Sequence, residues 1–97
     1  MDDQTRNKIA ESLESLAAQQ VWNAVVWQQC FDIVEANTDD ELVAYFFDDL
    51  IHYTGTPLFT REPRPADIQS YAQEFRDMAQ AVRSRMSLSD FKKNYGW

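Results

Sequence analysis

The residues that interrupt helices are confined to one short part of this chain. All three prolines and one of the two glycines lie between residues 55 and 65, and the other glycine is Gly96. Long stretches without glycine or proline favour helices over a β-fold with many turns. The chain has 97 residues and is 44% apolar, which is enough for one modest core. We therefore predict a single domain over residues 1–97, folded as an all-α, compact bundle of four or five helices.

The N-terminal third has the apolar spacing of a helix that begins at residue 2 or 3. Ile9 and Leu13 recur at helical intervals, with acidic residues on the other faces. From residue 21 to residue 34 the chain is apolar on nearly every side of a helix, which indicates a central helix or one covered by a partner. The pattern leaves open whether residues 3–36 form one helix or two that bend near residues 18–20.

A polar segment at residues 37–41 is the clearest local signal for the start of a helix. Thr38 and Glu41 have the spacing of a capping box, in which each side chain accepts a hydrogen bond from the other residue's backbone N–H. The apolar run that follows predicts a helix, and Gly55 predicts its end in a left-handed conformation.

The prolines divide the C-terminal part of the chain. Pro57 and Pro63 predict a loop over residues 56–64, whereas Pro65 fits the first turn of a new helix. Apolar residues from 68 to 86 then follow a regular spacing of three and four, which predicts a long helix. Ser87 predicts the cap of a short final helix.

The net charge of −7 is distributed unevenly. Residues 9–60 contain no Lys or Arg, whereas residues 61–97 carry seven bases and five acids. The acids of the first stretch are Glu11, Glu14, Asp32, Glu35, Asp39, Asp40, Glu41, Asp48 and Asp49. Because phosphate contacts need Lys and Arg, this half is not expected to bind nucleic acid directly. It suits a basic partner. The alternative is that the net charge only keeps a small domain in solution.

The residue types for catalysis or metal binding are sparse. His52 is the only histidine and Cys30 the only cysteine, and neither has a partner at the spacing of a nucleophilic or zinc site. The adjacent acids Asp48 and Asp49 are more typical of a solvated helix face than of a catalytic pair. We therefore predict a protein that is not an enzyme and that needs no cofactor and no metal.

The first residues and the hydropathy of the chain bear on its location. The segment Met1-Asp2-Asp3-Gln4 has neither the basic region nor the apolar region of a signal peptide. No apolar run approaches the roughly 18 residues that a membrane span requires. We expect a cytoplasmic protein that has no contact with a membrane.

The segment from Phe31 to Pro57 reads FDIVEANTDDELVAYFFDDLIHYTGTP and resembles the colicin E-type nuclease immunity proteins. Residues 40–43 match the E-L-V sequence that opens that family's second helix, and residues 54–58 stand where its loop lies. Asp90-Phe91-Lys92-Lys93 is similar to the family's tail, whereas Phe59-Thr60 replaces its adjacent tyrosines. The resemblance implies a four-helix protein that neutralises a bacterial nuclease toxin by masking the toxin's basic surface.

Charge and resemblance together predict a small acidic inhibitor or immunity protein that binds a basic protein partner. The expected contact residues are four acids and three apolar anchors, namely Asp39, Asp40, Asp48 and Asp49 with Tyr45, Leu58 and Phe59. One alternative is a phage-type inhibitor or nucleic-acid mimic that acts on a defence complex. Another is a self-associating helical adaptor, possible as a homodimer, which Trp22 and Trp27 favour because exposed aromatic patches mark interfaces.

Overall fold

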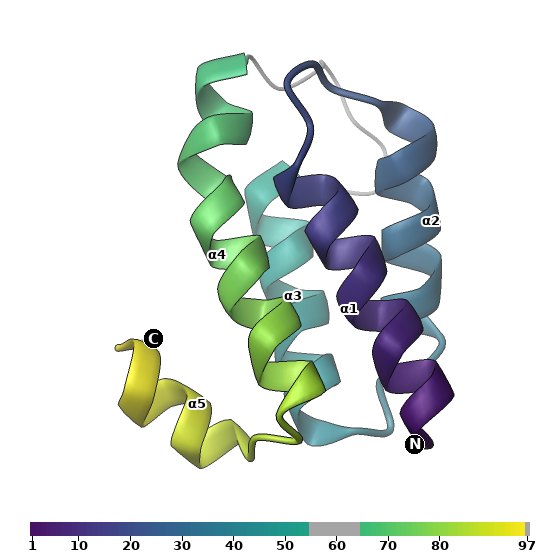
Figure 1. Ribbon diagram of the computed structural model, residues 1–97, viewed down its shortest axis with the longest axis vertical. Helices are drawn as coiled ribbons and strands as arrows, with labels where there is room; N and C mark the ends of the chain where they lie inside the picture. The colour runs from purple at the N-terminus through teal and green to yellow at the C-terminus, as the bar shows by residue number, and fades with distance from the viewer. Residues whose placement is uncertain (55–64, 97) are drawn as a thin grey trace.

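Five helices account for the secondary structure of the part of the chain that the computed structural model describes (Figure 1). This part covers residues 1–54 and 65–96, with side chains for residues 1–51 and 69–96. The helices are α1 (Asp3–Ala17), α2 (Ala24–Glu35), α3 (Glu41–Thr54), α4 (Pro65–Arg83) and α5 (Leu88–Tyr95). No strand occurs within these ranges. The predicted all-α bundle is thus confirmed.

A break separates α1 from α2, so that residues 3–36 form two helices. No glycine or proline lies in this break, and two polar side chains instead bind the backbone N–H groups there. The Asn23 side chain caps α2 by accepting the backbone N–H groups of Val25 and Val26 at 2.9 and 3.2 Å. The Gln19 side chain accepts the N–H of Asn23 at 2.8 Å. These bonds satisfy N–H groups that a helix start leaves without partners.

The hydrophobic core joins all five helices. α1 packs most extensively against α4 and next against α2, and Figure 1 shows α1 between these two helices with α3 behind. Ile9, Leu13 and Leu16 of α1 have no exposed surface. From the other helices, Trp27, Phe46, Met78 and Phe91 are also fully or almost fully buried. Burial of one such side chain contributes about 1.5–3 kcal/mol, which makes these residues the main source of stability.

The start of α3 differs from the predicted capping box. The Asp40 carboxylate, not Thr38, accepts the N–H groups of Leu42 and Val43, at 3.0 and 3.1 Å. The Thr38 hydroxyl instead donates to the carbonyl of Glu35 at the end of α2. Asp40 is the better cap in this position because its negative charge also complements the positive end of the helix dipole.

The turn between α4 and α5 holds an arginine where glycine is usual. The N–H groups of Arg85 and Met86 bond back to the carbonyls of Val82 and Ala81, at 3.2 and 3.0 Å. This is the Schellman pattern of a helix end, and Arg85 takes its left-handed position with φ 54°. As predicted, Ser87 then caps α5 by accepting the N–H of Asp90 at 3.1 Å.

Several predictions concern residues 52–68. α3 ends at Thr54 and α4 begins at Pro65, as expected from the sequence. The left-handed stop at Gly55 and the loop with Leu58 and Phe59 lie outside the described residues. The side chain of His52 does so as well.

Replacing Asp40 with alanine should lower the free energy of unfolding by about 1 kcal/mol, because two N–H groups lose their acceptor. Thr38→Ala is the matched control at a neighbouring exposed site, and its effect should stay within about 0.5 kcal/mol. Urea titration followed by circular dichroism measures both values. A larger loss of unfolding free energy for Thr38→Ala than for Asp40→Ala would show that Thr38 is the cap.

Arg85→Gly should be more stable than Arg85→Ala by about 1 kcal/mol. Both substitutions remove the arginine side chain, but only glycine adopts a left-handed conformation without a steric cost. The comparison therefore isolates the backbone strain at this turn. Equal midpoints and slopes of the two variants in urea would show that the left-handed position is unstrained.

Candidate interaction surface

Exposed acids cluster along the second half of α2, the following turn and the first two turns of α3. Asp32 and Glu35 are exposed on α2, Asp39 is exposed in the turn, and Glu41 and Asp48 are exposed on α3. Glu41 and Asp48 are seven residues apart, so they lie on one face of the helix. Among the residues that the structure describes, none has an ion pair with Asp39, Glu41 or Asp48. We call Asp39, Glu41 and Asp48 the acidic surface.

The other predicted contact residues lie in different surroundings. The Asp40 carboxylate is engaged as the cap of α3, and Asp49 is only half-exposed. Tyr45 packs against the core, and the Lys92 ammonium of α5 lies over its ring, 4.9 Å from the centroid. Partial burial, and then the nearby Asp49 carboxylate, raise the pKa of the Tyr45 hydroxyl. Of the predicted acids, Asp39 and Asp48 are thus the exposed ones. The predicted anchors Leu58 and Phe59 lie outside the described residues.

Glu41 joins this surface although its sequence position indicated a capping role. Since Asp40 takes over the cap, the Glu41 side chain has no reciprocal partner and extends into solvent. Its i+7 relation to Asp48 is the sequence signal that identifies it, because residues at that spacing share a helix face.

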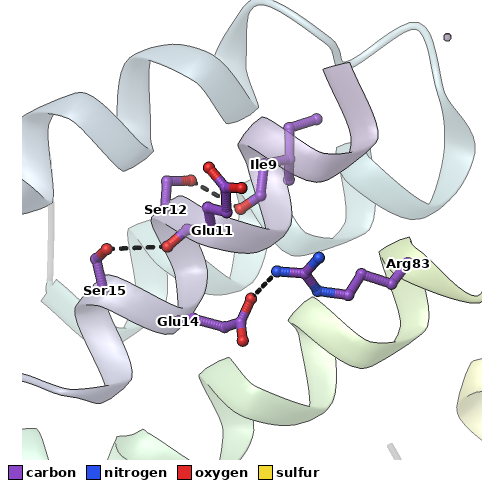
Figure 2. Close-up of polar contacts among 6 residues, drawn as sticks. All are labelled: Ile9, Glu11, Ser12, Glu14, Ser15 and Arg83. Carbon is purple, nitrogen blue, oxygen red and sulfur yellow. Dashed lines mark hydrogen bonds and ion pairs between the residues drawn. The ribbon is translucent and has the colours of Figure 1, made fainter. Parts of the chain in front are cut away.

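Two arginines, at the end of α4 and in the turn after it, pair with acids of the N-terminal helix. Arg83 pairs with Glu14, as Figure 2 shows, and Arg85 pairs with Asp3. Exposed pairs of this kind contribute little to stability, about 0–1 kcal/mol. These two pairs place the guanidinium groups of Arg83 and Arg85 against α1, whereas the Lys92 ammonium lies over the Tyr45 ring of α3.

Nucleophilic chemistry has little support in the described residues. Burial raises the pKa of the Cys30 thiol to about 12, although a hydrogen bond with Ser12 acts in the opposite direction. The hydroxyls of Ser12 and Ser15 donate to carbonyls of their own helix, those of Ile9 and Glu11, at 2.8 and 2.9 Å (Figure 2). A thiol with this pKa is protonated at neutral pH, and the thiolate is the nucleophilic form. Cys30 is therefore a core residue.

The described residues lack two other kinds of feature, a metal-binding cluster and a membrane-spanning helix. They contain no group of three or more His, Cys, Asp or Glu side chains arranged to hold a metal ion. None of their helices combines the length and the apolar character that a bilayer span needs. Exposed acids are of the kind that contact a basic macromolecule.

The raised pKa of Cys30 makes a prediction for alkaline solution. The unfolded thiol loses its proton near its ordinary pKa of roughly 8.5, whereas the folded thiol keeps it until about 12. Deprotonation therefore favours the unfolded chain, and the stability due to this group is lost as pH rises through that window. The stability difference between the parent protein and Cys30→Ala should shrink from pH 9 towards pH 12. A constant difference in urea titrations across this range would contradict the assignment.

No protein-family model, curated protein or solved structure matches this chain. The likeness of residues 31–57 to the immunity proteins consequently stays a prediction.

Proposed function

We propose that this protein is a small acidic inhibitor that binds a basic protein and blocks its action, with a bacterial nuclease toxin as the expected class of partner. The observation that carries the proposal is the acidic surface. Asp39, Glu41 and Asp48 are exposed and form no ion pair with the described residues, while Arg83 and Arg85 pair with α1.

The physical basis is electrostatic complementarity. Exposed acids that are held on capped helices need no large rearrangement to meet a basic surface, so little conformational entropy is lost on binding. Attraction between unlike charges accelerates encounter and disfavours wrong partners. A nuclease presents such a basic surface because it must bind phosphates. The resemblance of residues 31–57 to nuclease immunity proteins supports the same class of partner.

The experiment uses the intact protein as bait and compares two double variants. Glu41→Gln with Asp48→Asn removes two acids of the acidic surface. The matched control, Asp90→Asn with Glu11→Gln, also removes one acid from the first turn of a helix and one exposed acid further along a helix. The two variants therefore have the same net charge and the same change at a helix N-terminus.

We expect the parent protein and the control to capture a basic protein from the host and to inhibit its nuclease activity. The acidic-surface variant should bind more slowly, with an on-rate reduced by about tenfold and a weaker dependence on salt. Equal on-rates and salt slopes for the two variants would exclude the acidic surface. A captured protein that is acidic, or whose activity is unchanged by binding, would contradict the inhibitor function itself.

A further inference from the structure

One face of α3 places an aromatic ring between two acids of the acidic surface. Glu41, Tyr45 and Asp48 follow one another at spacings of four and three residues within the helix, so their side chains share one side of it. The two acids are exposed, whereas Tyr45 is half-buried and packs against the core. Because burial, and then the Asp49 carboxylate, raise the pKa of the Tyr45 hydroxyl, a cation at this place meets a neutral ring and not a phenolate.

A cation of the same chain already lies on this ring. The Lys92 ammonium of α5 is 4.9 Å from the centroid of the Tyr45 ring, within the roughly 6 Å over which an aromatic face attracts a cation. Lys92 is exposed and forms no ion pair with the described residues. Among these residues, the ring of Tyr45 is thus the partner of its charge.

The packing of α5 holds Lys92 at this position. α5 lies beyond the end of α4 in Figure 1 and packs mainly against α3. The fully buried Phe91 ring meets the Phe46 ring of α3 edge-on, with 4.9 Å between the centroids. Each ring of this buried pair is next in sequence to a member of the Lys92–Tyr45 pair. The core therefore fixes the backbone of α5, while the four-carbon stem of Lys92 can swing its ammonium away from the ring without moving the helix.

We propose that Lys92 makes an autoinhibitory contact, in which its ammonium covers the Tyr45 ring in the unbound protein and is displaced by a lysine or arginine side chain of the basic partner. The inference rests on the proposed function, because it names how the acidic surface is regulated. A partner's cation that reaches the ring also comes between the Glu41 and Asp48 carboxylates, with which Lys92 forms no ion pair. The incoming cation thereby gains an attraction that the tethered one lacks.

The contact sets a threshold for binding at this surface. The apparent affinity for a partner is its intrinsic affinity reduced by the fraction of molecules in which the ring is uncovered. An exposed contact between a cation and an aromatic ring changes an equilibrium by about two- to fivefold, and Lys92 lowers the affinity by a factor of this size. Isolated basic residues therefore compete poorly, which favours a partner with several cations in the right arrangement.

Binding of an unlabelled hexa-arginine peptide to the full-length chain, measured by isothermal titration calorimetry at low salt, tests the proposal. Lys92→Gln should bind the peptide about two- to fivefold more tightly than Lys93→Gln. Lys93 is the matched control because it is exposed in the same last turn of α5, so that its removal changes the net charge and the helix C-terminus equally. Lys92→Arg should restore the parent affinity, since a guanidinium also binds an aromatic face.

Two further measurements identify the ring as the site of the effect. In a Tyr45→Leu background the two glutamine variants should bind the peptide equally, because the interaction that distinguishes them is gone. In the parent protein, nuclear magnetic resonance should show the ε-methylene protons of Lys92 shifted upfield by the ring. Saturating peptide should return these protons to the values of an exposed lysine.

Equal peptide affinities of Lys92→Gln and Lys93→Gln, or an ε-methylene shift that saturating peptide leaves unchanged, would overturn the autoinhibitory contact. So would a peptide that binds neither the parent protein nor Lys92→Gln. These outcomes are distinct from a failure of the inhibitor function, which is decided by the charge of the captured natural partner and by its activity in the complex.

Discussion

The packing of α1 against α4 is the contact on which the rest of the structure depends. These helices are far apart in sequence, yet they share the largest helix–helix interface of the described residues. Their buried faces meet in the core, with Leu13 on one side and Met78 and Val82 on the other. This contact also decides where charge lies, because it brings Arg83 to Glu14 and Arg85 to Asp3. Glu41 and Asp48 of α3 therefore form no ion pair with the described residues because of how the core is assembled.

Four helices in the described part of the chain begin at a polar side chain, whereas α5 ends at Gly96 in the left-handed conformation. Asp2, Asn23, Asp40 and Ser87 each accept a backbone N–H at the start of a helix. A cap both ends the preceding turn and orients the next helix, because its side chain has to meet N–H groups that point along the new axis. The acids of the 37–41 segment therefore differ in role. Asp40 caps α3, while Asp39 and Glu41 remain exposed.

The sequence predicts the helices more reliably than their surfaces, and the reason is the range of the interactions. The start of α1, the regular spacing of α4 and the Ser87 cap follow from neighbouring residues, whereas the apolar pattern left open whether residues 3–36 form one helix or two. The choice of Asp40 over Thr38 does not, because residues 37–40 are all good caps and the core decides the register of α3. The ring of Tyr45 beneath Lys92 depends on tertiary packing and has no local signal. The apolar residues of α2 occur on all of its sides, so the sequence does not tell that Val25 reaches solvent while Trp27 is buried.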